Sequence, residues 1–339
     1  MRRAAVVAAM LFWALPRLGG AAPRTEAPRL DPSRVSALPS HIVRVAPAVV
    51  GIHADVPAGR PSTATLGTER WGSGVIFDKA GYALTVSYVV LDAASVQVTL
   101  HGGGTVAARV VGLDLESGLG VIKLDGAGPW PAAALGDSTK TAVGEVTATV
   151  GLDSVGDLVA VQGKVHAIRS FAASWEYMLE RAFIVAPYNP AFGGAAVVNA
   201  AGEIVGIASL RLGEEPFVNL AIPIEQFQAG RDELIAKGRV ESRRPRPWLG
   251  LYTRERDGGG VIVAGVSPFG PARTAGFRPG DVIVRVNGAD VSSQADFYRR
   301  LWLGMVEQDV RLEVMREARL EAITVHPVDR YRLLQTDRR

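Results

Sequence analysis

The stretch Ala275-Gly276-Phe277-Arg278-Pro279-Gly280-Asp281-Val282-Ile283, followed by Val286-Asn287-Gly288, decides the fold of the C-terminal part of the chain. Pro279-Gly280 makes a tight turn directly before an apolar run, which predicts a buried strand. Asn287-Gly288 favours a hairpin turn, because both residue types tolerate a positive φ. The pattern predicts a small unit of short strands joined by tight turns.

The flanking sequence extends this unit over residues 248–330, with a tail at 331–339. We predict a strand at 261–264, a helix at about 294–302, and two further strands at 310–315 and 323–326. With its two turn signals, the unit resembles a PDZ domain.

This resemblance implies a peptide-binding role for the loop that opens the unit. In PDZ domains, the loop corresponding to Trp248-Leu249-Gly250-Leu251 presents backbone N–H groups to the carboxylate at a peptide C-terminus. The peptide itself adds as a strand at the sheet edge. Trp248, Leu249, Gly250 and Leu251 are therefore the candidate peptide-binding residues, and peptide or protein C-termini are the candidate partners. The alternative is a PDZ fold that only packs on the first domain.

Upstream of this unit, the chain changes to short β-branched runs separated by Gly and Asp turns. This pattern, with almost no helical periodicity, indicates an all-β barrel or sandwich. A helix is expected at about Ile224–Lys237, followed by a linker at 238–247. The expected strands are 48–52, 74–77, 96–100, 121–124, 145–150, 158–165, 195–198, 204–208 and 217–222.

Residues 41–237 resemble the protease domain of the HtrA/Deg family. The landmarks that match, in family order and spacing, are Gly72-Ser73-Gly74-Val75-Ile76, Gly81-Tyr82-Ala83-Leu84-Thr85, Leu135-Gly136-Asp137-Ser138, Asn189-Pro190, Gly202-Glu203-Ile204-Val205-Gly206-Ile207 and Ala221-Ile222-Pro223. The resemblance implies a mainly β fold, a trypsin-like double β-barrel followed by the PDZ domain, and descent from serine endopeptidases.

The three catalytic positions that this resemblance assigns hold other residues. Tyr88 stands where the family pattern Leu-Thr-x-x-His-Val-Val has its histidine. Gly118 stands at the acid, and Gly193 stands at the serine of Asn-Pro-Gly-Asn-Ser-Gly-Gly-Pro. In the same loop, Ala191 and Ala195 replace glycines and Phe192 replaces a small polar residue.

The chemistry of the missing groups predicts a pseudoprotease. A serine hydroxyl is a weak nucleophile until an imidazole takes its proton, and the acid fixes the tautomer of that imidazole. In subtilisin, loss of the serine or histidine costs roughly 10⁶-fold in rate, about 8 kcal/mol of barrier. Tyrosine, with an ordinary pKa of about 10, is no useful base at neutral pH.

The enzyme alternative is a serine-type endopeptidase with residual or rewired activity. Ser87 is the stray hydroxyl in this region, and it has no identifiable base. The five histidines, His41, His53, His101, His166 and His326, show no metal-ligand spacing, so no metal site is expected. His101-Gly102-Gly103-Gly104 is interpreted as a glycine hairpin turn.

The N-terminus predicts a secretory signal peptide over residues 1–22. Arg2-Arg3 precedes an apolar run from Ala4 to Leu15, and small residues follow at Gly19 to Ala22. Residues 23–40 are expected to be a flexible N-terminus of the mature protein. The predicted location is periplasmic or secreted, with an uncleaved membrane anchor as the alternative. No later segment is apolar and long enough to span a bilayer.

The composition of the chain limits which classes of partner and cofactor are expected. A net charge of +3 without basic runs interleaved with aromatics gives little support to nucleic-acid binding. The densest basic stretch, Arg243-Arg244-Pro245-Arg246, is interpreted as a solvated linker. The chain has no cysteine, which excludes disulfides and thiol chemistry. No cofactor is expected. An active HtrA-like paralogue and a homo-oligomer are further candidate partners.

Overall fold

Two closed β-barrels form the first domain of the computed structural model, which describes residues 38–256 and 259–333. The first barrel has the strand order β1-β2-β3-β6-β5-β4. Its strands are β1 (Val49–Asp55), β2 (Glu69–Asp78), β3 (Tyr82–Val86), β4 (Ser95–Leu100), β5 (Thr105–Asp114) and β6 (Leu119–Leu124). All of its strand pairs are antiparallel, so short turns suffice to connect most of them.

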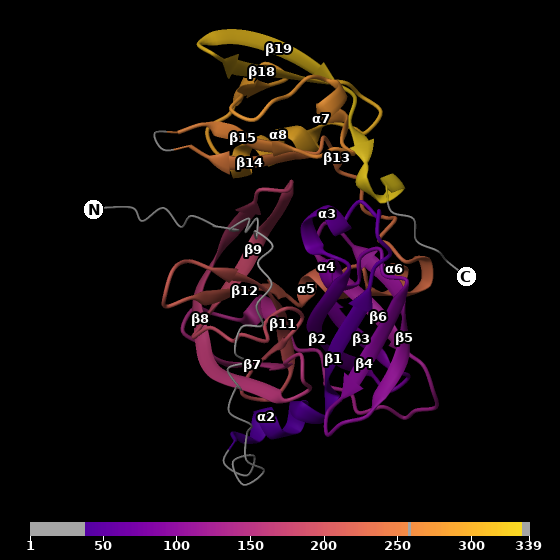
Figure 1. Ribbon diagram of the computed structural model, residues 1–339. Helices are drawn as coiled ribbons and strands as arrows, with labels where there is room; N and C mark the ends of the chain where they lie inside the picture. The colour runs from indigo at the N-terminus through magenta and orange to yellow at the C-terminus, as the bar shows by residue number, and fades with distance from the viewer. Residues whose placement is uncertain (1–37, 257–258, 334–339) are drawn as a thin grey trace, which may run out of the picture.

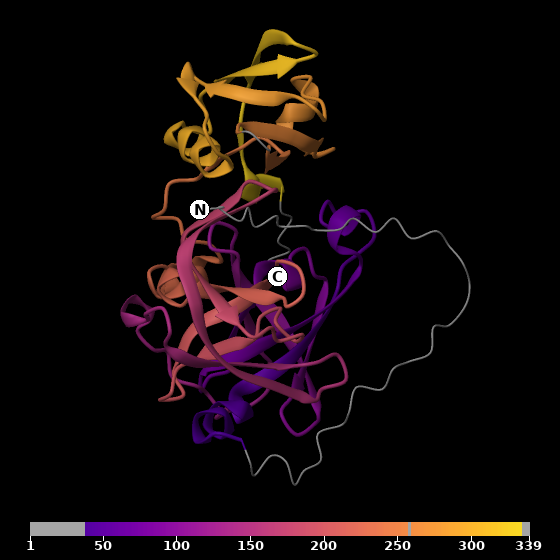
Figure 2. The same ribbon diagram turned by 90° about the vertical axis from the view of Figure 1, so that its left-hand side faces the viewer.

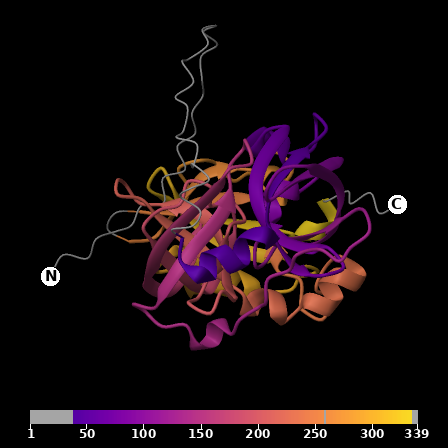
Figure 3. The ribbon, with the colours of Figure 1, turned by 90° about the horizontal axis from the view of Figure 1, so that it is seen from below.

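The second barrel has the order β10-β11-β12-β9-β8-β7 and lies beside the first (Figure 1). Its strands are β7 (Val146–Leu152), β8 (Leu158–Ala173), β9 (Tyr177–Ala186), β10 (Ala196–Val198), β11 (Ile204–Leu212) and β12 (Val218–Pro223). The short helix α2 (Ser40–Val45) lies at the lower end of the barrels, facing the viewer in Figure 3. Its Ile42 and Val45 are buried. This architecture is the predicted trypsin-like double barrel.

The second domain is a six-stranded antiparallel sheet with two helices. The sheet order is β14-β15-β16-β18-β19, so β14 is an edge strand. The elements are β14 (Leu251–Glu255), β15 (Val261–Val266), α7 (Pro271–Thr274), β16 (Val282–Val286), β17 (Ala289–Asp290), α8 (Gln294–Leu303), β18 (Val310–Arg316) and β19 (Arg319–Val325). Asn287 and Gly288 have φ values of 50° and 83°, which confirms the predicted hairpin turn between β16 and β17.

Short elements connect the two domains and the barrel strands. β13 (Pro247–Trp248) pairs with β20 (Val328–Asp329), so both ends of the PDZ domain are joined beside the barrels. The remaining short elements are η1 (Ala46–Ala48), α3 (Thr63–Leu66), α4 (Ser87–Val90), η2 (Ser138–Lys140), α5 (Glu225–Gln228), α6 (Arg231–Lys237) and η3 (Arg330–Leu333).

Several element predictions differ from the structure, and the strands β3 and β5 of the first barrel were not among those expected. The single helix expected at Ile224–Lys237 is two helices, α5 and α6, separated at Gly230. A Cβ on Gly230 would lie 2.4 Å from Val240, so the chain turns where no side chain fits. The strand expected at 158–165 continues to Ala173, and its partner β9 was not predicted. The hairpin β8–β9 rises from the second barrel to the PDZ domain (Figure 2).

The interpretation of residues 243–246 as a solvated stretch fits Arg244, which is exposed, but not Arg243 and Arg246, which are half-buried and paired. Arg243 Nη1 lies 2.9 Å from both carboxylate oxygens of Asp114, which is 2% exposed. Arg246 pairs with Glu116 at 3.3 Å and stacks its guanidinium 4.1 Å from the Trp302 ring. Two of the three arginines of this stretch thus pair with carboxylates of the first domain.

No described helix has the length and apolar character needed to cross a membrane. The predicted signal peptide at 1–22 and most of the 23–40 segment lie outside the described residues.

Candidate functional site

The three positions that the family resemblance assigns to catalysis lie together where the barrels meet. Ser87, the first residue of α4, donates its N–H to the carbonyl oxygen of Gly118 over 2.8 Å. The next residue, Tyr88, reaches the loop before β10, where a Cβ on Gly193 would lie 3.0 Å from its Oη. The first barrel therefore supplies Tyr88 and Gly118, and the second supplies Gly193.

Tyr88 is held as a hydrogen-bond donor. Its hydroxyl donates to the carbonyl oxygen of Ser209 over 2.7 Å. Desolvation by burial raises the pKa of Tyr88 above its ordinary value. A phenol with a raised pKa keeps its proton, so Tyr88 cannot act as a general base at neutral pH.

The space beside Gly118 is taken by another phenol. Tyr177, the first residue of β9, donates its hydroxyl to the carbonyl oxygen of Ser117 over 2.7 Å. A Cβ on Gly118 would lie 3.0 Å from that hydroxyl, and the φ of Gly118 is 82°. A side chain at this position would have to displace Tyr177 and adopt a strained backbone.

The loop around Gly193 is organised by a buried asparagine. Asn189 accepts the N–H of Ala191 at its Oδ1 over 2.8 Å and donates from Nδ2 to the carbonyl oxygen of Thr149. In trypsin-like enzymes the oxyanion hole uses the N–H of the serine and the N–H two residues before it. Ala191 holds that second position here, so its N–H is already engaged.

Phe192 completes an aromatic cluster beside this loop. Its ring centroid lies 5.9 Å from that of Tyr188, which lies 5.8 Å from that of Phe217. Arg211 covers Phe217 at 4.6 Å. Bulky rings replace the small polar residue that the family carries at position 192.

Ser87 is buried and has no histidine partner. Across residues 38–256 and 259–333, no hydrogen bond joins a histidine to a serine. His53 stacks on Trp71, and His326 bonds Asp309. No group of described His, Asp or Glu residues could hold a metal ion. His101 lies at the β4–β5 turn, where Leu100 donates its N–H to Gly104.

The candidate peptide-binding loop already holds a carboxylate, which comes from the same chain. The N–H groups of Leu249 and Leu251 donate to the two oxygens of Glu176 over 2.9 and 2.7 Å. Gly250 lies between them and has a φ of 82°. A Cβ on Gly250 would lie only 2.7 Å from the Cα of Gly270. We expected a loop open to an external terminus; Glu176 at the β8–β9 turn occupies it instead.

Glu176 is 6% exposed and has a strained backbone, with a φ of 54°. Burial raises the pKa of Glu176 to about 7, although the N–H groups of Leu249 and Leu251 oppose this shift. Neither Glu176 nor Tyr177 was predicted from the sequence as a site residue. The signal available was weak, one acidic residue between two aromatic ones at an unrecognised turn.

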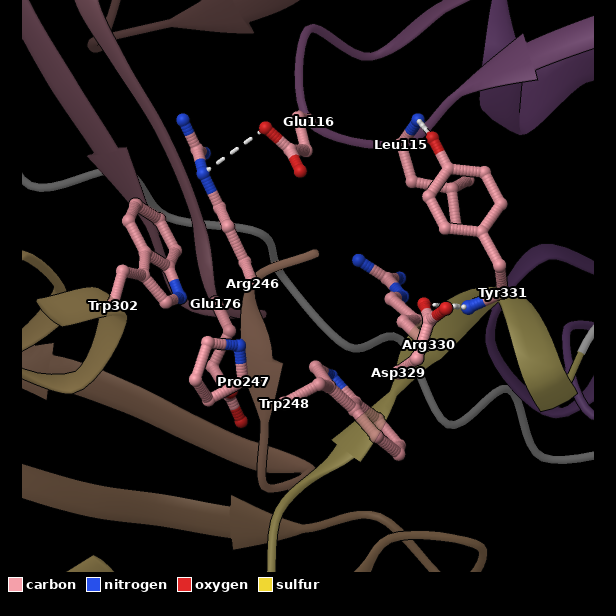
Figure 4. Close-up of a pocket in the computed structure, with 10 residues that line it drawn as sticks. All are labelled: Leu115, Glu116, Glu176, Arg246, Pro247, Trp248, Trp302, Asp329, Arg330 and Tyr331. Carbon is pink, nitrogen blue, oxygen red and sulfur yellow. Dashed lines mark hydrogen bonds and ion pairs between the residues drawn. The ribbon is translucent and has the colours of Figure 1, made fainter. Parts of the chain in front are cut away.

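A water-sized cavity of about 30 Å³ lies beside Glu176 at the domain boundary (Figure 4). Residues of both domains line it: Leu115, Glu116, Glu176, Arg246, Pro247, Trp248, Trp302, Asp329, Arg330 and Tyr331. Tyr331, counted in the predicted tail, accepts the N–H of Leu115 at its hydroxyl over 2.9 Å. Hydrogen bonds and ion pairs thus join the two domains around this cavity.

Comparisons with known proteins agree with this architecture. Residues 72–207 match the trypsin-like peptidase domain, and residues 247–326 match the PDZ domain. The "Serine protease Do-like HtrA" of Lactobacillus helveticus is 30% identical over 75% of this chain and 67% of its own length. The "Probable periplasmic serine endoprotease DegP-like" of Halomonas elongata is 31% identical over 75% of this chain and 55% of its own.

Solved structures give the same result. The structure titled "HtrA-type protease AlgW with decapeptide" superposes with a TM-score of 0.54 and 25% identity, covering 86% of this chain and 98% of that one. Sequence relatives, domain order and tertiary structure coincide, so this chain belongs to the HtrA/Deg family of trypsin-like peptidases with one PDZ domain.

Proposed function

We propose that this protein is an exported HtrA-family pseudoprotease that binds peptide or protein C-termini through its PDZ domain. The observation that carries the proposal is the meeting of Tyr88, Gly118 and Gly193 at one place between the barrels. The three positions themselves carry no imidazole, carboxylate or serine hydroxyl. Without a nucleophile and a base, the tetrahedral intermediate of peptide hydrolysis cannot form.

The surroundings of these residues support the proposal. Tyr177 fills the space next to Gly118, and the Ala191 N–H is engaged by Asn189. Restoring one catalytic residue would therefore not restore the site.

The binding role rests on the geometry of the PDZ loop. Leu249 and Leu251 aim their N–H groups at one carboxylate, so the loop can recognise this group. In this proposal the protein works in the periplasm or outside the cell. There it binds the C-termini of peptides or proteins, or it acts as a scaffold or regulator of an active HtrA-like paralogue. It can also assemble as a homo-oligomer.

The experiment compares hydrolysis by the purified mature protein with buffer, using unfolded casein and an active HtrA protease as positive control. We expect no turnover above buffer and no labelling by a fluorophosphonate probe. The Gly193→Ser variant should remain inactive, because Tyr88 supplies no base. Inhibitor-sensitive turnover that disappears in Ser87→Ala would contradict the proposal and support the rewired peptidase.

A further inference from the structure

The turn of the β8–β9 hairpin lies along the open edge of the PDZ sheet. β14 is the edge strand, and its Thr253 donates its N–H to the carbonyl oxygen of Ser174 over 2.8 Å. Thr253 is fully buried, so this hydrogen bond is shielded from water. A backbone carbonyl from outside the sheet thus takes a ladder position that an added strand would use.

The helix α8 contacts the same turn from the other side. Tyr298 donates its hydroxyl to the carbonyl oxygen of Ala173 over 2.6 Å, and Gln294 Nε2 donates to that oxygen over 3.2 Å. The N–H of Glu176 donates to the Tyr298 hydroxyl over 3.2 Å. Both walls of the groove between β14 and α8 are therefore bonded to one segment, residues 173–176.

The end of this segment reproduces the chemistry of a chain terminus. The Glu176 carboxylate receives the N–H groups of Leu249 and Leu251, the donors that PDZ loops offer to a terminal carboxylate. Met178, two residues on, is 3% exposed and packs in the apolar core of the PDZ domain with Leu249 and Phe297. The segment thus brings a carboxylate to the PDZ loop, a backbone carbonyl to the edge strand, and an apolar side chain to the PDZ core.

We propose that residues 173–178 are an internal ligand of the PDZ groove, and that an external chain end binds only by displacing them. This inference rests on the proposed peptide-binding function and adds its regulation. The external ligand is a polypeptide with a free C-terminal carboxylate and an apolar last residue, the two groups that Glu176 and Met178 supply internally.

A tethered ligand has a large advantage over a free one. The hairpin is covalently attached beside its site, which corresponds to an effective concentration in the millimolar range for short connections. The apparent dissociation constant of an external peptide equals the intrinsic one divided by the fraction of open groove. If the groove is open about one tenth of the time, removing the internal carboxylate should tighten peptide binding about tenfold.

The experiment uses full-length mature protein and labelled peptides with an apolar last residue, each as free acid and as amide. The variants are Glu176→Ala and the isosteric Glu176→Gln, which keeps the side-chain volume. The matched control is Glu180→Gln, which removes a carboxylate from the same hairpin. Glu180 pairs with Arg299 of α8 at 2.6 Å, but both side chains are exposed and neither touches the loop.

Two readouts separate the internal ligand from the binding function. Hydrogen exchange at the Leu249 and Leu251 amides reports on the hairpin without any peptide, and anisotropy reports peptide affinity. We expect faster exchange and about tenfold tighter binding of free acids in both Glu176 variants, with little change in Glu180→Gln. Free-acid peptide added to the wild type should also deprotect the Glu176 amide.

Each failure has a different meaning. Unchanged exchange and unchanged affinity in both Glu176 variants would overturn the internal ligand and leave peptide binding intact. Faster exchange without binding of any peptide, or equal binding of amides and acids, would support the internal ligand and refute the proposed peptide function. Thermal unfolding of each variant identifies any loss of folding.

Discussion

Two neighbouring glycines in the loop before β10 have different physical roles. Gly194 has a φ of 95°, and a Cβ there would lie 2.0 Å from the carbonyl oxygen of Ser73. Gly193 has no positive φ, and its Cβ would meet only the end of the Tyr88 side chain at 3.0 Å. Gly194 is therefore required by the fold, whereas Gly193 occupies a position where a serine would fit.

We predict that Gly194→Ala destabilises the protein by about 3 kcal/mol, from the positive φ together with the overlap with a backbone atom. Gly193→Ala, the control one residue earlier, should change the free energy of unfolding by less than about 1 kcal/mol, because it also reduces the entropy of the unfolded chain. Urea denaturation measures both. Equal losses in the two variants would contradict this assignment.

The segment between the two domains is held to the first barrel by an ion pair between Arg243 and Asp114. Arg243 is the nearest partner of the buried Asp114 carboxylate, and its Nη1 lies between both oxygens. Arg244, the next residue, is exposed and donates only to the carbonyl oxygens of Leu303 and Gly304. Two adjacent arginines of the same segment thus differ in burial and in partner.

Arg243→Ala should destabilise the protein by about 3 kcal/mol, because it leaves the Asp114 carboxylate buried without its countercharge. Arg244→Ala should have an effect below about 1 kcal/mol, as is usual for exposed polar contacts. Thermal or urea unfolding of the two variants tests this difference. A loss in Arg244→Ala as large as that in Arg243→Ala would show that general linker charge, and not the Asp114 pair, is responsible.

In the whole molecule, the contact between the two domains includes a titratable group, the Glu176 carboxyl. Burial raises the pKa of Glu176 to about 7, against about 4.5 for an ordinary glutamate. The charged or titratable groups that face it are Arg330, which lowers the pKa of Glu176 but does not cancel the effect of burial, and Tyr298, whose own pKa burial raises. Between these two pKa values the folded protein holds a proton on Glu176 that the unfolded chain has released.

Stability should therefore fall as the pH rises from about 5 to 8, relative to Glu176→Gln, which has no proton to lose. The sign follows because the folded state binds more protons in this interval. The expected difference between wild type and variant changes by on the order of 2 kcal/mol, measured by urea unfolding at both pH values. All other residues are the same in the two proteins, so the difference between them reports on position 176. An unchanged difference would show that Glu176 titrates normally in the folded state.

Much of the architecture could be predicted from local signals. Pro279-Gly280 and Asn287-Gly288 specify turns through their own backbone preferences, and the PDZ sheet follows from them. Glycine-rich His101 to Gly104 specified its hairpin in the same way. The β8–β9 turn has no such signal, because Glu176 adopts its positive φ without the help of glycine or asparagine.

The sequence by itself determined the two-domain β architecture, the family, and the residue types at positions 88, 118 and 193. These depend on turn preferences, apolar patterns and motif order, which are written locally along the chain. Only the tertiary structure decided that Glu176 enters the PDZ loop, 73 residues from Leu249, and that Arg243 neutralises Asp114, 129 residues away. Such contacts follow from the way two folded domains fit together, and no periodicity of the chain encodes which carboxylate meets which donor.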